Sequence, residues 1–145
     1  MQNNPIAYQV RKVGRADRNL AVDCYYIASE TLGDADCFIE SIPYDVNVLQ
    51  RPMFVAEKKS NGYLVGFVLG KMLDQKTAEI ASLYVTSRAR RNGIGATLLS
   101  QMEDYLRARG VIQVQLTSRP MAVHFYTERG YVRRKVGSHY LQKTL

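Results

Sequence analysis

The sequence has few of the features that would place it in a special class of protein. It contains only two cysteines, Cys24 and Cys37, at a spacing that fits no metal site, and a chain of 145 residues needs no disulfide. Apolar stretches such as residues 63–73 are interrupted by Gly and Lys, and they fall short of the roughly 20 residues of a membrane span. Its first residues carry neither the basic nor the apolar part of an export signal. We therefore expect a cytoplasmic protein with reduced thiols and no membrane partner.

Histidine is equally scarce. His124 and His139 are the only two, and neither has a partner at ligand spacing, so we expect no metal. The chain also lacks internal repeats, low-complexity tracts and linkers rich in Pro, Gly or Ser. Hydrophobic residues make up 46% and charged residues 23% of the sequence, which excludes a disordered chain. We predict that residues 1–145 form a single domain.

The positive charge of the chain is concentrated in one segment. The net charge is +7, and residues 86–135 hold ten Lys or Arg against three Asp or Glu, whereas residues 1–85 hold nine against ten. A basic patch of this kind attracts an anion, either a nucleic-acid backbone or a phosphorylated cofactor. A solvated basic face is the alternative.

An antiparallel meander is predicted in the N-terminal half of the chain. Residues 53–59 and 63–73 are rich in β-forming residues, and Asn61-Gly62 between them is a strong hairpin signal. A second turn leads into a third strand over residues 78–85. Before this meander we expect a short strand and an amphipathic helix, over residues 8–13 and 17–32.

The C-terminal half alternates between helices and strands. Apolar residues at helical spacing predict a helix from Ile94 that ends before Gly110, followed by a strand over residues 111–116. This strand–helix–strand unit implies a locally parallel strand pair. The remaining elements are a short helix between Pro120 and Gly130 and strands over residues 131–136 and 139–142. We predict an α/β (α+β) fold with a mixed central sheet of about six to seven strands, flanked by about four helices.

The most informative segment lies between the strand over residues 78–85 and the helix that starts at Ile94. Gly93 and Gly95 let the backbone curl and approach a ligand without obstruction by a Cβ atom. The helix directs free N–H groups and the positive end of its dipole toward an anion. Three arginines add positive charge on the same side: Arg88, Arg90 and Arg91. Together these features predict a pyrophosphate-binding loop, with a simple tight turn as the alternative.

This loop differs from the common nucleotide-binding motifs. It lacks the Gly-x-x-x-x-Gly-Lys order of a P-loop, and Leu98 stands where a dinucleotide motif has its third Gly. Arg90, Gly93 and Gly95 instead fit motif A of the GCN5-related N-acetyltransferase (GNAT) superfamily, which the loop resembles. The resemblance implies acetyl-CoA as co-substrate, with its pyrophosphate held by Arg90, Arg91, Asn92, Gly93, Ile94, Gly95 and Ala96.

Further matches extend the resemblance over residues 63–136. The family's second motif is similar to the set Ala122, Phe125, Tyr126, Gly130 and Tyr131. Glu79 precedes Arg90 by eleven residues, as a Glu does in the histone acetyltransferase branch of the family. One position differs from the family pattern. Arg119 stands where many members have an Asn that contacts the pantetheine arm. Either Ser118 or Arg119 takes over this contact, or the contact is absent.

Acetyl transfer to an amine requires an unprotonated amine, a polarised carbonyl and a stabilised thiolate. Glu79 is the candidate base, with a cross-strand pairing to Lys71 as an equally weighted alternative. The resemblance favours Tyr126 as the acid that protonates the thiolate, over a purely packing role in the core. Backbone N–H groups are candidates for polarising the carbonyl where the parallel strands splay, namely those of Leu83, Tyr84 and Val85.

The acceptor is an amine in this interpretation, and the sequence offers one hint of its charge. Residues 34–45 lie in the region that resembles the family's acceptor-side helices, and they carry four acidic residues and no basic one: Asp34, Asp36, Glu40 and Asp45. Such a loop attracts a cationic amine, although a solvated acidic loop is the alternative. Small-molecule amines and protein lysines or N-termini are all compatible with the sequence.

Two other functions compete with this interpretation. A nucleic-acid- or ribosome-binding module would interleave aromatic and basic residues on one surface. Here much of the charge instead clusters beside the Gly-rich loop and at Arg129 and residues 133–135, near the expected ribose phosphate of coenzyme A, so we expect no nucleic-acid partner. The second is a regulator that binds acyl-CoA without turnover, against which Glu79 and Tyr126 both argue. Exposed edge strands near the C-terminus are compatible with a homodimer.

Overall fold

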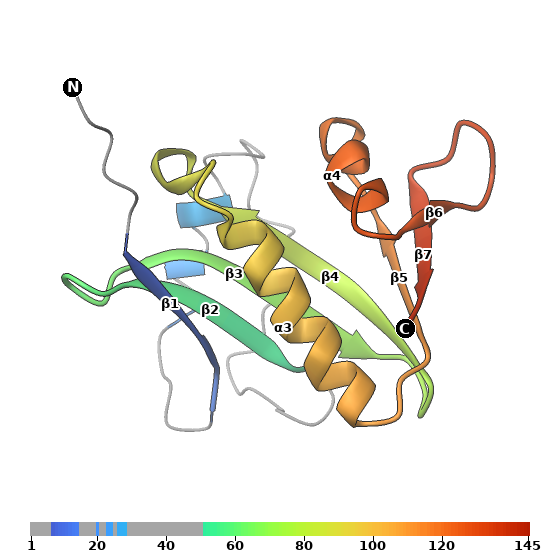
Figure 1. Cartoon of the computed structure of the whole chain (residues 1–145), viewed down its shortest axis with the longest axis horizontal. Coiled ribbons are helices and arrows are strands. Elements are labelled where there is room, and N and C mark those ends of the chain that lie inside the picture. The colour runs from blue at the N-terminus through green and yellow to red at the C-terminus, as the bar shows by residue number, and fades with distance from the viewer. Residues whose placement is uncertain (1–6, 15–19, 21–22, 25, 29–50) are drawn as a thin grey trace.

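One mixed sheet forms the framework of the fold. The computed structural model describes residues 7–14, 20, 23–24, 26–28 and 51–145. Within these residues seven strands are hydrogen-bonded in the order β1-β2-β3-β4-β5-β7-β6 (Figure 1). The strands are β1 (Tyr8–Lys12), β2 (Met53–Lys58), β3 (Leu64–Met72), β4 (Thr77–Val85), β5 (Gln113–Thr117), β6 (Val132–Arg133) and β7 (Tyr140–Thr144). The predicted mixed sheet with a parallel strand pair is therefore confirmed.

The predicted meander of β2, β3 and β4 is present, and its first turn is the Asn-Gly hairpin. Gly62 has a φ angle of 74°, which glycine adopts without a steric penalty. Its N–H donates to the carbonyl of Lys58 at 2.8 Å, and the N–H of Lys58 donates to the carbonyl of Tyr63 at 2.9 Å. The second turn is fixed by the carboxylate of Asp74, which accepts hydrogen bonds from the backbone N–H groups of Lys76 and Thr77.

The sheet opens where β4 meets β5. These two strands are parallel, and their pairing is limited to Thr77 with Gln113, Ala78 with Val114, and Glu79 with Gln115. Beyond this point β4 continues to Val85 while β5 diverges from it toward α4 (Val123–Thr127), as Figure 1 shows. The edge of β4 that faces β5 is therefore without a strand partner over its C-terminal part, within the described residues.

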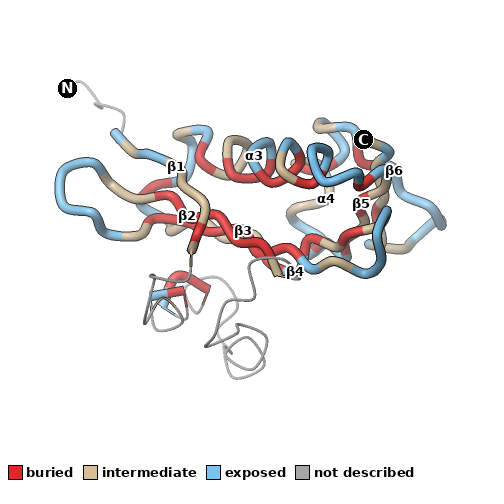
Figure 2. Tube along the Cα trace, turned by 90° about the horizontal axis from the view of Figure 1, so that it is seen from below, coloured by how far each residue is buried: buried red, intermediate tan, exposed pale blue. Residues whose placement is uncertain are grey.

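Helix α3 (Ile94–Ala108) covers one face of the sheet, as Figure 2 shows. Its buried residues recur at helical spacing and include Leu98, Met102 and Leu106, which pack in one core with Ala78 and Ile80 of β4. A second core lies on the other face of the sheet, where Phe67 and Leu69 of β3 pack with Cys24, Ile27 and Ala28. Because both faces are covered, β2 and β3 are buried along most of their length.

The helix predicted over residues 17–32 is only partly visible. Leu20, Asp23, Cys24 and residues 26–28 are helical, and the other positions lie outside the described residues. The acidic segment over residues 34–45 lies outside them as well. No helix in the described part of the chain is long and apolar enough to cross a membrane.

Three predicted boundaries in the C-terminal half were wrong. The strand expected over residues 131–136 is reduced to β6, because the chain turns after it, with Gly137 at a φ angle of 79° and the N–H of Ser138 donating to the carbonyl of Lys135. β5 starts at Gln113 rather than at Val111, whose N–H instead caps α3 by donating to the carbonyl of Leu106. The last strand, β7, runs to residue 144 rather than 142, since its later residues pair with β5.

Candidate active site

The loop between β4 and α3 is held in a tight curve by its own contacts. A short 3₁₀ turn spans Ser87–Ala89, after which Arg91 and Gly93 take positive φ angles of 69° and 74°. The side-chain amide of Asn92 donates to the carbonyls of Ala89 and Arg90, at 3.0 and 3.2 Å. Asn92 therefore shapes the loop from within.

The first turn of α3 leaves its backbone donors available. Gly93 is the N-cap residue and has no side chain to accept from them, and the first turn carries no acidic residue. Thr97 turns away from this end, because both its N–H and its hydroxyl donate to the carbonyl of Gly93 at 3.0 Å. A helix start of this kind favours a negatively charged group.

A cavity of about 340 Å³ opens in front of this loop and is enclosed by three parts of the chain. The first wall is the end of β4, namely Leu83, Tyr84 and Val85. The second is the loop and the start of α3, namely Ala89, Arg90, Arg91, Gly93, Ile94, Gly95 and Ala96. The third comes from α4 and the turns around it, namely Arg119, Ala122, Phe125, Tyr126 and Arg129.

A smaller cavity of about 50 Å³ lies where β4 and β5 separate. It is lined by residues 80–84 on β4 and by residues 116–119 at the end of β5. Five residues line both cavities, so the two spaces adjoin: Leu83, Tyr84, Arg119, Ala122 and Tyr126. We call these five residues the junction.

The larger cavity is positively charged. Four arginines line it, and no acidic residue does among those that the structure describes. Arg90 is held by a hydrogen bond from Nε to the carbonyl of Val85 at 3.2 Å. Arg129 donates from Nη1 to the carbonyl of Phe125 at 2.7 Å, and its guanidinium lies 3.9 Å from the centre of the Phe125 ring. A cavity with low-dielectric walls and several positive charges attracts an anionic ligand.

The junction includes two tyrosines, Tyr84 and Tyr126. Burial raises the pKa of Tyr126 to about 12, and the nearby charge of Arg119 opposes this rise. Burial also raises the pKa of Tyr84, again opposed by Arg119. Both hydroxyls therefore keep their protons at neutral pH and serve as hydrogen-bond donors. The hydroxyl of Tyr126 makes no hydrogen bond with the part of the chain that the structure describes.

The open edge of β4 presents polar backbone groups to the cavities. The N–H of Thr86 donates to Val65 on the β3 side, and the carbonyl of Val85 faces the other way, toward Arg90. Because backbone polar groups alternate along a strand, those of Leu83 share the open edge with those of Val85, and those of Tyr84 face β3. Two of the three predicted N–H groups thus point to the cavity side.

Glu79 and Asn92 line neither cavity, unlike the other predicted site residues. Glu79 lies opposite Lys71 in the β3–β4 register, and no ion pair joins these two described side chains. Since Ala78 and Ile80 pack under α3, Glu79 projects from the other face of the sheet. Within the described residues, no group of three or more His, Cys, Asp or Glu side chains is arranged to hold a metal.

Sequence reasoning missed two contributors to the site. The side chain of Tyr84 lines both cavities, whereas only its backbone was considered. Phe125 lines the larger cavity from α4, next to Arg129, which was expected near the ribose phosphate of coenzyme A. Their i, i+4 spacing was a usable signal, because residues so spaced share one face of a helix.

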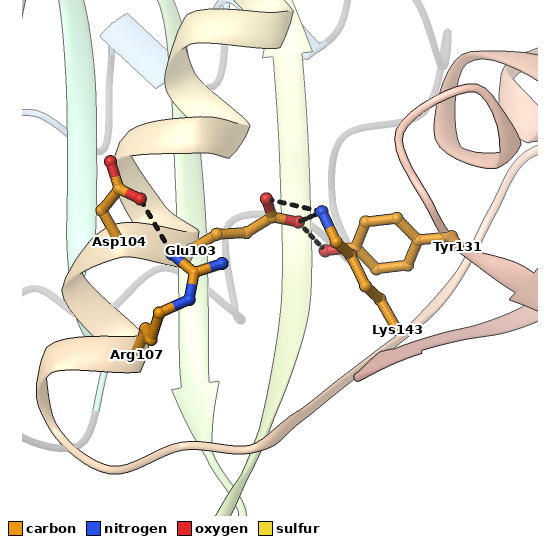
Figure 3. A network of polar contacts seen from close by, with 5 residues as sticks. All are labelled: Glu103, Asp104, Arg107, Tyr131 and Lys143. Carbon is orange, nitrogen blue, oxygen red and sulfur yellow. Dashed lines mark hydrogen bonds and ion pairs between the residues drawn. The ribbon is translucent and has the colours of Figure 1, made fainter. Parts of the chain in front are cut away.

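A buried polar cluster lies behind the third wall of the cavity (Figure 3). Glu103 of α3 accepts a hydrogen bond from the Tyr131 hydroxyl at 2.8 Å and pairs with Nζ of Lys143 at 3.0 Å. The ring of Tyr131 meets that of Tyr126 edge to face, with centroids 5.6 Å apart. The N–H of Tyr131 also donates to the carbonyl of Tyr126 at 3.1 Å. The cluster thus anchors the chain that carries Tyr126 to α3 and β7.

Comparisons with known proteins agree with this geometry. The model of the family described as "Acetyltransferase (GNAT) family" matches residues 18–131. No curated protein is similar enough in sequence to match the chain.

Solved structures match over nearly the whole chain. GCN5 from Tetrahymena is 17% identical, with a TM-score of 0.76, over 94% of this chain and 95% of that one. The PaiA N-acetyltransferase from Thermoplasma acidophilum, solved in complex with coenzyme A, is 21% identical, with a TM-score of 0.76, over 97% of this chain and 100% of that one. Ard1 from Thermoplasma volcanium is 20% identical, with a TM-score of 0.70, over 97% and 99% of the two chains. At these identities the likeness establishes the fold.

Proposed function

We propose, since the chain belongs to the GNAT acetyltransferase family, that it is an acetyl-CoA-dependent N-acetyltransferase acting on a primary amine. The observation that carries the proposal is the pair of adjoining cavities between the splayed strands, with arginines and a free helix start at one end. A site of this form suits a long ligand with phosphates at one end and a small reactive group at the other.

The residues of the larger cavity fit coenzyme A. The N–H groups at residues 93–96 and the guanidinium of Arg91 would hold the pyrophosphate, which is doubly charged. The open edge of β4 would bind the pantetheine amides as an added strand does, through the backbone groups of Leu83 and the N–H of Val85, whose carbonyl already accepts from Arg90. The structural neighbour from Thermoplasma acidophilum was solved with coenzyme A, which supports the same ligand here.

Acetyl-CoA supplies a thioester, and the acceptor amine attacks its carbonyl carbon directly while both molecules are bound. A carbon–nitrogen bond forms, the carbon–sulfur bond breaks, and its electron pair leaves with the sulfur. The backbone N–H groups on the open edge of β4 are candidates for polarising the carbonyl. Tyr126 belongs to the junction, and its hydroxyl would donate a hydrogen bond toward the departing sulfur.

Glu79 remains the candidate for accepting the amine proton. Its carboxylate lines neither cavity, so its action in this proposal runs through a water molecule rather than by direct contact. The acceptor is a primary amine of a small molecule or of a protein lysine or N-terminus.

The competing nucleic-acid interpretation is less well supported, because four arginines of the basic segment line the cavity. Calorimetric titration with acetyl-CoA distinguishes the two. We expect one-to-one binding that weakens by about 10- to 100-fold in an Arg90→Ala/Arg91→Ala double variant, as expected for lost charge-assisted hydrogen bonds.

The matched control for this titration is Arg133→Ala/Lys135→Ala. It removes the same charge from the same basic segment, at residues that were expected from the sequence near the ribose phosphate but that line neither cavity in the structure. Its affinity for acetyl-CoA should stay near that of the wild type. Equal weakening in both double variants would indicate a diffuse electrostatic effect, and absence of binding in the wild type would overturn the proposed function.

A further inference from the structure

The junction between the two cavities contains one cation, Arg119. This residue follows β5 and precedes Pro120, with an extended backbone at φ −64° and ψ 149°. Its carbonyl accepts a hydrogen bond from the hydroxyl of Ser118 at 2.7 Å, which fixes the backbone at this point. Its guanidinium carbon lies 5.3 Å from the centre of the Tyr84 ring. The residue is therefore positioned from both its backbone and its side chain.

The guanidinium of Arg119 differs from those of Arg90 and Arg129 in its contacts, and from that of Arg91 in its place, because Arg91 lines only the larger cavity. Arg90 and Arg129 each donate to a nearby backbone carbonyl, at 3.2 and 2.7 Å. The guanidinium of Arg119 makes no hydrogen bond or ion pair with any residue in the part of the chain that the structure describes. Its five N–H donors remain available to a ligand that reaches the junction.

The chemistry proposed for this site creates a negative charge near the junction. When the carbon–sulfur bond breaks, the electron pair of that bond goes to sulfur, and the sulfur leaves as a thiolate. Tyr126 is a weak acid for this thiolate, because its pKa of about 12 lies well above the roughly 8.5 of a thiol. Proton transfer from the phenol is thus uphill by more than three powers of ten, and hydrogen bonding alone leaves the charge on sulfur.

We propose that Arg119 is a catalytic residue whose guanidinium stabilises the negative charge on the departing sulfur, while the Tyr126 hydroxyl donates a hydrogen bond to the same atom. The proposal rests on the proposed function. In this reaction the carbon–nitrogen bond replaces the carbon–sulfur bond. The amine proton goes to water or to Glu79, and the thiolate takes a proton from solvent after its release. Arg119 supplies charge and transfers no proton, as its side chain stays protonated throughout.

This role differs from simple binding of the pantetheine arm. A binding residue alters the affinity for every coenzyme A derivative and leaves the acidity of the bound thiol unchanged. A residue that stabilises a thiolate lowers the pKa of that thiol, because an opposite charge within a few ångströms favours the ionised form. The pKa of the thiol in bound coenzyme A therefore separates the two roles without an acceptor.

The experiment is a pH titration of bound coenzyme A, followed by the ultraviolet absorbance of its thiolate. In the wild type we expect a thiol pKa at least about one unit below that of free coenzyme A. In Arg119→Gln the pKa should return to the free value or above it, and Arg119→Lys should retain part of the shift. Arg133→Gln, which removes an arginine outside the cavities, should titrate like the wild type.

Each outcome is informative. An unshifted thiol in the wild type, or the same shift in Arg119→Gln, overturns the proposal while leaving the proposed function in place. A variant that loses coenzyme A affinity but keeps the shift assigns Arg119 to binding and also overturns it. Failure of the wild type to bind coenzyme A overturns the proposed function itself. Because Arg119 is exposed, we expect Arg119→Gln to unfold at the same urea concentration as the wild type.

Discussion

The hydroxyl of Tyr131 donates a 2.8 Å hydrogen bond to Oε2 of Glu103, a residue 28 positions earlier in the chain. Both side chains are buried, and Lys143 completes the cluster from β7. Three elements that are distant in sequence are thereby tied together directly behind Tyr126. The stability of this corner of the fold depends on a carboxylate whose negative charge is compensated by one ammonium group.

We expect the cluster to contribute measurably to stability. Tyr131→Phe removes one hydrogen bond to a charged group and should cost about 2 kcal/mol of unfolding free energy. Glu103→Gln leaves Lys143 without its counter-charge in a largely buried setting and should cost more, about 2–4 kcal/mol. Urea denaturation measures both changes.

The control for these two variants is Asp104→Asn. It breaks an ion pair with Arg107 on the same helix (Figure 3). The side chains of Asp104 and Arg107 are 69% and 51% exposed. Such surface pairs contribute little, so its unfolding free energy should change by less than about 0.5 kcal/mol. If Glu103→Gln costs no more than Asp104→Asn, the buried cluster does not stabilise the fold.

The raised pKa of Tyr126 predicts a loss of stability at alkaline pH. In the unfolded chain this phenol loses its proton near pH 10, and in the folded chain near pH 12. Between these values the unfolded state binds fewer protons, so the unfolding free energy falls as pH rises, by about 2–3 kcal/mol in all. Urea midpoints across this pH range should decline less steeply for Tyr126→Phe than for the wild type. Tyr63→Phe, a change at an exposed tyrosine, should keep the wild-type slope.

The small cavity predicts a preference for short acyl groups. Its 50 Å³ holds about three to five water-sized atoms, at roughly 10–15 Å³ each, which suits an acetyl group. We expect affinity to fall by about 10- to 200-fold for each added methylene. Leu116 lines this cavity, so Leu116→Ala should accept butyryl-CoA nearly as well as acetyl-CoA.

Leu106→Ala is the control for the acyl preference. Leu106 is fully buried on α3 and lines neither cavity. Leu106→Ala and Leu116→Ala should each lower the unfolding free energy by about 2–5 kcal/mol. Its preference for acetyl-CoA over butyryl-CoA, measured by calorimetry, should match the wild type. A preference that is absent in the wild type, or unchanged in Leu116→Ala, would contradict the assignment of this cavity to the acyl group.

The two interpretations of Glu79 predict different kinetics. If Glu79 is the base, Glu79→Gln should lower kcat by about 10²- to 10⁴-fold with an amine acceptor. As a cross-strand partner, Glu79 should behave like Lys71, which lies opposite it in register. Comparison of kcat for Glu79→Gln and Lys71→Gln decides between them: a similar small effect in both variants would rule out the base.

The sequence predicted the elements whose signals are local. Asn61-Gly62 specifies its hairpin through backbone conformation alone, and Gly93 specifies the start of α3 in the same way. β6 was overestimated because Tyr131, Val132 and Val136 are β-forming residues, whereas the chain already bends at residues 134–135, before Gly137. Tertiary pairing, rather than propensity, decides such boundaries.

The sequence predicted the loop of the site but not the cavity in front of it. The residues at 90–96 carry their signal in sequence order, whereas the cavity depends on how α4 approaches β4 across the opening. From the sequence, Glu79 was placed on its strand without an orientation, which the structure supplies because its neighbours Ala78 and Ile80 pack in the core. The polar cluster at Glu103 joins residues that are far apart in the chain, so no local sequence pattern predicted it.

The short parallel pairing of β4 with β5 couples the stability of the fold to ligand binding. The cavity walls come from both sides of this three-pair contact, so a molecule bound there interacts only with a chain in which both sides are assembled. Such a ligand stabilises the folded state by mass action, by about 2.7 kcal/mol at a concentration 100 times its Kd. The small fraction of unfolded chain therefore falls as the concentration of whatever occupies the cavity rises.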